Sequence, residues 1–238
     1  MIKIIGIRNK YKMSWIDRGS YYEHTAAQGT DPWGDARLGR VNSSSSGAMV
    51  GKSPFKTAEE TGKIIAGVVE EQFSDKSIQA MDHGHLCEPR GRNWYEKTYD
   101  CKVIERGLCV SKEDFRFGAS VDGEIVGKDG IIEIKCPKKM WKPILNYMNA
   151  KERGWKPPPN YYDHIYDTHL CQMMHGMAIL KKSFCDYIVY STEDNKVFVQ
   201  RVHFDPDFWN NHYQILKKNY ELYIAPYLIN SKYPISPI

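Results

Sequence analysis

Residues 115–139 read F-R-F-G-A-S-V-D-G-E-I-V-G-K-D-G-I-I-E-I-K-C-P-K-K, and this stretch decides the expected fold. It predicts a β-hairpin, with an alternating first strand that ends at Val126, a glycine-flanked turn at 127–130 and a return strand over 131–136. The rest of the chain is therefore expected to be arranged around this hairpin.

The return strand should place charged and apolar side chains on opposite faces, because successive side chains of a strand alternate. Glu133 and Lys135 then share one face. Ile132 and Ile134 share the other face and are expected in the core. The hairpin also brings Asp122, eleven positions before Glu133, close to the two charged side chains.

Two carboxylates and a lysine in this arrangement suit metal-assisted cleavage of a phosphodiester. Mg²⁺ takes hard oxygen ligands and is commonly held by one or two carboxylates together with phosphate oxygens, so Asp122 and Glu133 fit it. Lys135 would orient the attacking water or help to deprotonate it, and would offset the charge that develops on the phosphate. The simpler alternative is an exposed Glu133–Lys135 ion pair on an edge strand, because such pairs are common on solvated faces.

Three further motifs accompany the hairpin. They are W-G-D-A-R-L-G-R-V-N-S-S at Trp33–Ser44, H-L-C-E-P-R at His85–Arg90 and Q-M-M-H-G-M-A at Gln172–Ala178. Together with S-V-D-G and E-I-K-C-P of the hairpin, they resemble the PD-(D/E)xK nuclease core and, more narrowly, the lambda-type exonucleases, also called YqaJ-like viral recombinases. This resemblance covers residues 33–178 and implies an α/β fold with a central mixed β-sheet flanked by helices.

The resemblance also implies a role for each residue of the expected site. Lys135 would position the attacking water, and Gln172 would hold that water or a phosphate oxygen. A lone glutamate or glutamine on a helix is more often a solvated residue, so Glu88 and Gln172 depend on the match to the family. One or two Mg²⁺ ions, with Mn²⁺ as a substitute, are expected, and the implied ligands are Asp122, Glu133, Glu88 and the main-chain carbonyl of Ile134.

A second group of residues, Arg37, Ser44 and Ser120, suggests a phosphate-binding pocket. The serine run Ser43–Ser46 would be a flexible linker, a helix N-cap or an anion site, because hydroxyls and free amides at a helix start bind phosphate. Ser120 lies two residues before Asp122, so on a strand both side chains would face one side. The resemblance implies that the three residues bind a terminal 5′-phosphate. The alternative roles are a surface arginine, an N-cap and a strand-edge hydroxyl.

The composition is that of a globular protein with little excess charge. The chain has 238 residues, of which 42% are hydrophobic, and its 33 Lys and Arg against 29 Asp and Glu give a net charge of +4. This balance does not by itself indicate a nucleic-acid binder, so a DNA-binding surface must be local. The candidate DNA contacts are Arg90, Arg92, Lys138, Lys139 and Lys142. The alternative for each of them is an ordinary solvated charge at the surface.

The six cysteines include no C-x-x-C pair and no close cluster, which argues against a zinc or iron–sulfur site. They are interpreted as free thiols of an intracellular protein. The apolar run at the N-terminus is too short for a signal peptide, and no run of about 18 apolar residues indicates a membrane span. We therefore expect an intracellular protein without membrane association, in the host cytoplasm or nucleus if the source is viral.

The remaining segments predict one nuclease domain, residues 1–238, with residues 1–32 and the tail 225–238 at its periphery. The expected start is a strand-like run at 2–7, and the tail shows no helical period. A capping box at Thr57 should begin a helix whose apolar stripe is Ile64, Ile65, Val68, Val69 and Phe73. The other expected elements are helices over about 75–99, 141–151, 161–181 and 205–223, a strand over 101–110 and a hairpin of 184–191 with 196–204, and the methionines Met173, Met174 and Met177 should be core.

The expected function is that of a Mg²⁺-dependent DNA exonuclease that acts on the ends of linear duplex DNA. The resemblance further implies a 5′-to-3′ direction, single-stranded 3′ overhangs, a ring-shaped homotrimer around the DNA and a single-strand-annealing protein as partner. One alternative is an endonuclease on the same core, of the restriction or host-shutoff type. The other is a DNA-binding protein with a decayed core, which would have lost one of Asp122, Glu133 and Lys135, all present here.

Two positions depart from the family pattern. Many relatives have proline before the metal-binding aspartate, where this chain has Val121, and a second glutamine where it has Met174. The first departure is a mild loop change. The second leaves Gln172 without the glutamine partner of the family, so no role is assigned to a glutamine pair.

Overall fold

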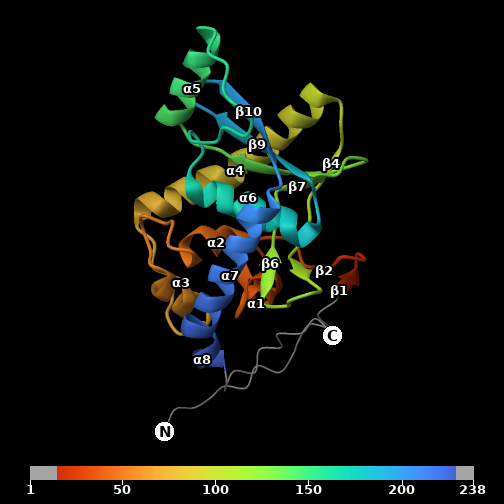
Figure 1. Ribbon diagram of the computed structural model, residues 1–238, viewed down its shortest axis with the longest axis vertical. Helices are drawn as coiled ribbons and strands as arrows, with labels where there is room; N and C mark the ends of the chain where they lie inside the picture. The colour runs from red at the N-terminus through yellow and green to blue at the C-terminus, as the bar shows by residue number, and fades with distance from the viewer. Residues whose placement is uncertain (1–14, 229–238) are drawn as a thin grey trace.

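The computed structural model describes residues 15–228, and within them the strands form two five-stranded mixed sheets (Figure 1). Each sheet combines one parallel pair with antiparallel pairs, so the expected α/β class with helices flanking mixed strands is confirmed. The strands are divided between two sheets instead of forming the single central sheet that was expected. The first sheet has the order β1 (Trp15–Asp17), β2 (Tyr21–His24), β5 (Cys109–Ser111), β6 (Phe117–Ala119), β3 (Val41–Asn42), and the second has the order β10 (Lys196–His203), β9 (Phe184–Ser191), β8 (Gly130–Lys135), β7 (Gly123–Ile125), β4 (Val103–Ile104).

The helices surround and separate these sheets. Helix α6 (Asp167–Leu180) crosses the middle of the molecule between the sheets (Figure 1). The longer helix α4 (Asp75–Tyr99) covers the face of the second sheet that points away from α6. No helix of residues 15–228 combines the length and the apolar character that a membrane span requires. The helices are α1 (Asp31–Arg37), α2 (Ser43–Met49), α3 (Ala58–Ile65), α4 (Asp75–Tyr99), α5 (Lys142–Glu152), α6 (Asp167–Leu180), α7 (Pro206–Tyr223) and α8 (Ala225–Leu228).

The central helix α6 is apolar on nearly all sides, which explains its place between the sheets. Its three methionines, Met173, Met174 and Met177, are buried, as the sequence predicted. Gly47 of α2 lets that helix approach closely, because a Cβ at this position would lie 2.8 Å from the Cα of Thr168. The packing of α2 on α6 therefore carries the serine segment toward the middle of the molecule.

The predicted hairpin is the antiparallel pair of β7 and β8, which lies in the second sheet. The alternation of the return strand is also as predicted. Ile132 and Ile134 pack with Tyr95 of α4 on one face, whereas Ile131 belongs to the core on the α6 side. Glu133, which is one residue from each isoleucine, therefore points to the α6 side of the sheet.

The chain passes from the first sheet to the second at residues 120–122, which are not part of a strand. The expectation that Ser120 and Asp122 lie on one strand is therefore wrong: β6 ends at Ala119 and β7 begins at Gly123. The crossing is held on both sides. The Gln28 side chain donates a hydrogen bond of 3.1 Å to the carbonyl of Val121, and the buried Val121 side chain faces α6.

The apolar stripe that was expected to continue the Thr57 helix ends earlier than predicted. The capping box forms, since the Thr57 hydroxyl accepts from the Glu60 amide while the Glu60 carboxylate accepts from the Thr57 amide. The helix then stops at Ile65, because Gly67 adopts a left-handed φ of +70° and its amide donates to the carbonyl of Ile64. Val68, Val69 and Phe73 are consequently exposed and outside the helix.

Other boundaries differ in ways that the local sequence did not reveal. The strand expected over 101–110 is two short strands in different sheets, because Gly107 passes so close to β2 that a Cβ would lie 2.2 Å from the carbonyl oxygen of His24. The helix expected from residue 161 begins at Asp167, and the first four residues of the expected tail form α8. The strand-like run at 2–7 and residues 229–238 lie outside the described residues.

The other expected hairpin and the last long helix agree with the structure. The second hairpin is formed by β9 and β10, and the last long helix is α7. Helix α4 runs unbroken over 25 residues although it contains Pro89. The described N-terminal part, β1 and β2, forms one edge of the first sheet.

Candidate active site

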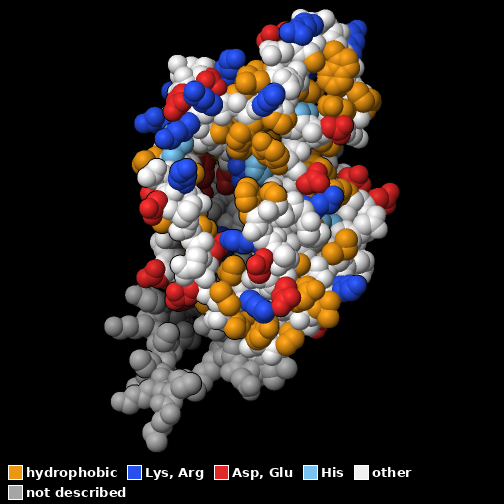
Figure 2. All heavy atoms as spheres, turned by 90° about the vertical axis from the view of Figure 1, so that its left-hand side faces the viewer, with side chains coloured by type: hydrophobic (Ala, Val, Ile, Leu, Met, Phe, Trp, Pro, Cys, Tyr) orange, Lys and Arg blue, Asp and Glu red, His pale blue; other side chains and the backbone are white. Residues whose placement is uncertain are grey.

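A cavity of about 700 Å³ opens between α4, β8 and the start of α6, and we call it the acidic cavity. Figure 2 shows a hollow on this face of the molecule, with acidic side chains in its depth and lysine and arginine side chains on the surface around it. All five residues predicted to be catalytic line the acidic cavity, as does Ile134. They are Glu88, Asp122, Glu133, Lys135 and Gln172.

The hairpin holds Asp122, the first of the two acids along the chain, in place. Asp122 stands at the crossing between the sheets, immediately before β7, and its Oδ2 accepts a hydrogen bond of 2.6 Å from the amide of Ile134. This bond ties the carboxylate to the return strand, next to the residue that follows Glu133. The two acids are therefore brought together by the hairpin, although only one of them lies within a strand.

Glu133 and Lys135 lie on the same face of β8 and form an ion pair, with 2.6 Å between Oε1 and Nζ. The Lys135 ammonium also donates a hydrogen bond of 3.2 Å to Oε1 of Gln172 on α6. Glu133 is buried, and Lys135 and Gln172 are half-buried. The strand and the central helix thus hold one ammonium between a carboxylate and an amide oxygen.

Burial and mutual repulsion change the proton affinity of the acids. The pKa of Asp122 rises to about 7, first because of burial and then because of the negative charge of Glu133. The pKa of Glu133 is also raised, mainly by burial, although Lys135 opposes the change. Burial together with the charge of Asp122 raises the pKa of Glu88 to about 7. The cavity therefore concentrates negative charge that the protein only partly compensates.

Lys135 keeps its proton in this surrounding. Burial by itself would lower the pKa of Lys135, but the carboxylates of Glu133 and Asp122 outweigh burial and raise it. The side chain is therefore a cation and a hydrogen-bond donor at neutral pH.

Glu88 reaches the cavity from α4 in the company of Arg92, four residues further along the same helix. The guanidinium of Arg92 donates to Oε1 of Glu88 at 2.9 Å, to Oε2 of Glu105 at 2.9 Å and to the carbonyl of Asp122 at 3.1 Å. Arg92 was predicted to contact DNA, but its guanidinium is used inside the protein. It holds the crossing segment that presents Asp122.

The oxygen atoms available in the acidic cavity suit a hard divalent cation that takes only a few of its ligands from the protein. Among residues 15–228, no three His, Cys, Asp or Glu side chains come together as a metal-binding group. Asp122 and Glu133 nevertheless provide two neighbouring carboxylates with raised pKa values, and the main chain of Ile134 lines the same cavity. Mg²⁺ is usually bound by one or two carboxylates and completes its shell with water and substrate oxygens, so these residues fit it.

The structure adds two aromatic residues to the site that the sequence analysis did not select, His169 and Trp141. Burial lowers the pKa of His169 to about 3, and its Nδ1 is 2.7 Å from the hydroxyl of Tyr187. His169 precedes Gln172 by three positions, and this spacing on a helix would have placed it on the same face. No comparable signal marked Trp141, whose ring centroid lies 5.3 Å from that of His169.

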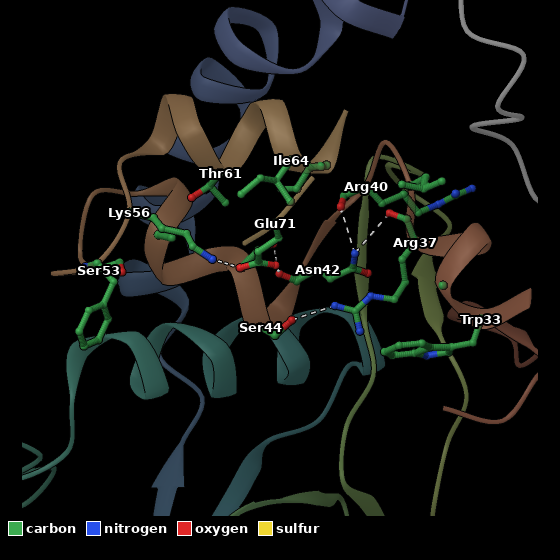
Figure 3. Close-up of a pocket in the computed structure, with 16 residues that line it drawn as sticks. Trp33, Arg37, Arg40, Asn42, Ser44, Ser53, Lys56, Thr61, Ile64 and Glu71 are labelled. Atoms are coloured by element: carbon green, nitrogen blue, oxygen red, sulfur yellow. Dashed lines mark hydrogen bonds and ion pairs between the residues drawn. The ribbon is translucent and has the colours of Figure 1, made fainter. Parts of the chain in front are cut away.

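Two of the three predicted phosphate residues, Arg37 and Ser44, line a second cavity of about 520 Å³, which we call the arginine cavity (Figure 3). The guanidinium of Arg37 donates a hydrogen bond of 3.0 Å to the Ser44 hydroxyl. It also lies over the ring of Trp33, 4.1 Å from the centroid. The indole of Trp33 in turn donates a bond of 3.0 Å to the Ser120 hydroxyl, so the three predicted residues are joined through Trp33.

Arg37 has no acidic partner among the described residues, and burial lowers its pKa to about 10. Glu71 also lines the arginine cavity, but its carboxylate forms an ion pair with Lys56 (Figure 3). Ser120 does not line the arginine cavity itself but stands at the crossing segment, two residues from Asp122. The arginine cavity therefore presents the cation Arg37 without an acidic partner in the described part of the chain. Trp33 and Ser120 connect this cation to the crossing segment that carries Asp122.

The other predicted DNA contacts lie at the surface. Arg90, Lys138, Lys139 and Lys142 are exposed, and Lys138 also lines the acidic cavity. Their contact with DNA stays a prediction.

Comparisons with known proteins indicate the family and the fold of the chain. A family model described as the YqaJ-like viral recombinase domain matches residues 32–183. The chain resembles the alkaline exonuclease LHK-Exo from Laribacter hongkongensis with a TM-score of 0.63 and 25% identity, over 83% of this chain and 94% of that chain, and the structure of LHK-Exo in complex with dAMP gives the same TM-score and coverage at 26% identity. A phage-related exonuclease from Haemophilus somnus 129PT shares the fold with a TM-score of 0.51 and 12% identity, over 79% of this chain and 93% of that chain. The comparison with curated proteins found no match.

Proposed function

The chain belongs to the YqaJ-like viral recombinase domain family, and we propose that it is a Mg²⁺-dependent DNA exonuclease that degrades linear duplex DNA from its ends. The observation that carries the proposal is the convergence of Asp122, Glu133 and Lys135 in the acidic cavity. The likeness to solved exonucleases supports the same reaction class.

The acids supply the site for the metal. Asp122 and Glu133, with the main-chain carbonyl of Ile134 and with Glu88 nearby, would hold the ion. When bound, Mg²⁺ lowers the pKa of a coordinated water and stabilises the charge of the phosphate undergoing attack. The raised pKa values of the two acids support this role, because a bound divalent cation would offset the burial and repulsion that disfavour their charged forms.

Lys135 and Gln172 would together orient the attacking water. Since the pKa of Lys135 is raised, we assign it the role of a donor that orients the attacking water and offsets phosphate charge, and not that of a general base. Gln172 keeps the ammonium in place through their 3.2 Å hydrogen bond. A water molecule or phosphate oxygen would then take the remaining donors of Lys135.

The arginine cavity supports a preference for the strand end. A terminal 5′-phosphate can accept from the guanidinium of Arg37 and from the Ser44 hydroxyl, which already face each other across 3.0 Å. Anchoring the 5′ end there would place a neighbouring phosphodiester toward Asp122, and cleavage would proceed from 5′ to 3′. The products would be mononucleotides and a duplex with single-stranded 3′ overhangs.

The family resemblance supports three further parts of the proposal. These are a ring-shaped homotrimer that encloses the duplex, a single-strand-annealing protein as partner in recombination, and action inside the host cell. Each can be tested separately from the chemistry, since cleavage of a single phosphodiester needs none of them.

The decisive experiment compares linear duplex DNA with covalently closed circles, each incubated with Mg²⁺ and again with a chelator. We expect rapid loss of linear DNA in Mg²⁺, intact circles, and no reaction in chelator. Cleavage of the circles would assign an endonuclease instead. Binding of DNA without cleavage of either substrate, in Mg²⁺ or Mn²⁺, would favour a DNA-binding protein with a decayed core.

A further inference from the structure

A pocket of about 470 Å³ that plays no part in the proposed chemistry lies between α5 and the segment 155–164. Four of its lining residues are aromatic, namely Tyr147, Trp155, Tyr161 and His164. We call it the aromatic pocket. Pro143, two residues after Trp141 of the acidic cavity, also lines it, so the pocket begins at the rim of the candidate active site.

The rings of the aromatic pocket form a fixed assembly. Tyr147 stacks on His164 with 3.7 Å between centroids and 15° between planes, and Tyr161 is parallel to Tyr147 within 9°. Trp155 meets both tyrosines edge-on, at 5.9 Å from Tyr147 and 5.2 Å from Tyr161. Tyr147 and His164 are buried, whereas Trp155 is 39% exposed and offers its ring to solvent.

Hydrogen bonds of the main chain and of the Gln200 side chain hold these rings in place. The amide of Trp155 donates to the carbonyl of Ala150 at 3.0 Å, directly at the end of α5. The side-chain amide nitrogen of Gln200 donates to the carbonyl of Tyr161 at 3.0 Å, and its Oε1 lies 2.5 Å from Nε2 of His164. The exposed ring of Trp155 and the half-buried ring of Tyr161 are therefore preorganised, which reduces the entropy lost when a ligand contacts them.

Three cations and one carboxylate, Glu152, are exposed within residues 151–156 beside the aromatic pocket. Lys151, Arg153 and Lys156 are exposed, and no carboxylate of the described residues forms an ion pair with any of them. The Nζ of Lys151 lies 5.7 Å from the centroid of the Tyr147 ring. One carboxylate, Asp163, lines the pocket and can accept a hydrogen bond from a ligand with N–H groups.

We propose that the aromatic pocket binds bases of single-stranded DNA, with one base stacked on the exposed ring of Trp155 and in edge contact with Tyr161, and with the adjoining phosphates near Lys151, Arg153 and Lys156. Exposed aromatic rings beside unpaired cations are the chemistry by which proteins bind single strands without sequence preference, since every base has a π-face. The pocket rests on the proposed function in one respect. Its ligand is the strand that remains after its complement has been degraded in the neighbouring acidic cavity.

The test measures binding of a labelled single-stranded oligonucleotide by fluorescence anisotropy in the presence of a chelator, so that cleavage plays no part. We expect Trp155→Ala to weaken binding by about tenfold, within the usual range for the loss of one base–aromatic stack. Trp155→Phe keeps a ring and should stay within about threefold of the unmodified protein. Tyr161→Ala is a second truncation that leaves the carbonyl of Tyr161 bonded to Gln200.

The matched control is Tyr227→Ala in α8, because Tyr227 is 41% exposed and α8 lies at the opposite end of the molecule from α5 (Figure 1). An abasic oligonucleotide of the same length separates stacking from charge. On that strand Trp155→Ala should bind as well as the unmodified protein. Changing Lys151, Arg153 and Lys156 to Gln should instead lower the salt dependence of binding to both strands, by about 0.7 in log–log slope for each phosphate that the protein no longer neutralises.

If both Trp155→Ala and Tyr161→Ala bound single-stranded DNA with unchanged affinity, the proposal would be wrong. A protein partner would then be the better candidate ligand for the aromatic pocket. An equal loss on the normal and abasic strands would also overturn it, because stacking would then make no contribution. The result is independent of the proposed function: a protein that cleaves nothing can still bind single strands through Trp155, and an active exonuclease can fail this test.

Discussion

The acidic cavity and the arginine cavity hold opposite charges, which the protein compensates only in part in the acidic cavity and which it does not pair with a carboxylate of the described residues in the arginine cavity. In the acidic cavity, burial and repulsion raise the pKa of Asp122 to about 7, which favours its neutral form. In the arginine cavity, burial lowers the pKa of Arg37 to about 10, again in the direction of the neutral form. Both cavities therefore keep a charged group in a place where the isolated protein stabilises it poorly.

This difference in sign indicates two different ligands. A cavity of acids gains from a cation, and a cavity with an unpaired arginine gains from an anion, so a metal ion and a phosphate are the complementary pair. The short crossing segment between the sheets connects them, since Ser120 is bonded to Trp33 beneath Arg37 and Asp122 follows two residues later. A substrate that carries an end phosphate and a scissile phosphodiester would occupy both.

The largest expected effect comes from removing a charge from the acidic cavity. Asp122→Asn or Glu133→Gln should lower the rate of duplex degradation in Mg²⁺ by at least about 100-fold, because several kcal/mol of transition-state stabilisation depend on the metal. Lys135→Ala should lower the rate by a similar factor with a smaller effect on Mg²⁺ affinity. The rates are measured as release of nucleotides from linear duplex DNA.

The matched control for these variants is Glu113→Gln, which alters an exposed carboxylate paired with Lys181 outside both cavities. Binding of duplex in chelator should persist in all the variants, since a single neutralised acid is a local change. If Asp122→Asn, Glu133→Gln and Lys135→Ala each kept more than about a tenth of the normal rate, the acidic cavity would not be the catalytic site.

An intermediate effect is expected from the arginine cavity. Linear duplex with 5′-phosphate ends should be degraded much faster than the same duplex with 5′-hydroxyl ends, and Arg37→Ala should remove most of this difference. A hydrogen bond to a charged group contributes about 1.5–3 kcal/mol, so the change in preference should be roughly 10- to 150-fold. Initial rates on the two duplexes give the measurement.

Two adjacent serines provide the control. The Ser44 hydroxyl accepts from Arg37, whereas the Ser45 hydroxyl donates to the carbonyl of Asn42 at 2.9 Å. Ser44→Ala should therefore weaken the preference for the phosphate, and Ser45→Ala should leave it unchanged. Equal rates on both kinds of end in the unmodified protein would exclude the arginine cavity from end recognition.

The smallest effect is a change in stability with pH in the absence of metal. Because the pKa of Asp122 is raised from 3.8 to about 7 in the folded state, the folded protein binds the additional proton between these values. The unfolding free energy contributed by Asp122 therefore falls as pH rises through this window. The protein in chelator should be less stable at about pH 8 than at about pH 5, and Asp122→Asn should reduce the loss, by about 2–4 °C in Tm for each kcal/mol.

Mg²⁺ should restore the stability at the higher pH in the unmodified protein, since a ligand that binds only the folded state stabilises it. Asp122→Asn should respond less to Mg²⁺. Thermal unfolding followed by circular dichroism checks both statements. An identical pH dependence in the two proteins would show that neither burial nor repulsion raises the pKa of Asp122 in the folded protein.

Much of the site could be predicted because it depends on local geometry. The alternation of β8 alone separates Glu133 and Lys135 from Ile132 and Ile134. The spacing of Asp122 from Glu133 across a glycine turn was enough to expect two neighbouring acids. By contrast, the end of α3 at Ile65 could not be read from its apolar stripe, because a left-handed glycine ended the helix within a run of apolar residues.

The sequence by itself therefore determined the hairpin, its two faces and the residue types of the site, since these follow from backbone periodicity and side-chain chemistry. Only the tertiary structure decided how these residues meet. It divided the strands between two sheets, turned Arg92 inward to hold the Asp122 segment and joined Arg37 to Ser120 through Trp33. These contacts join segments far apart in the chain, and their partners are selected by tertiary packing, which no local pattern specifies.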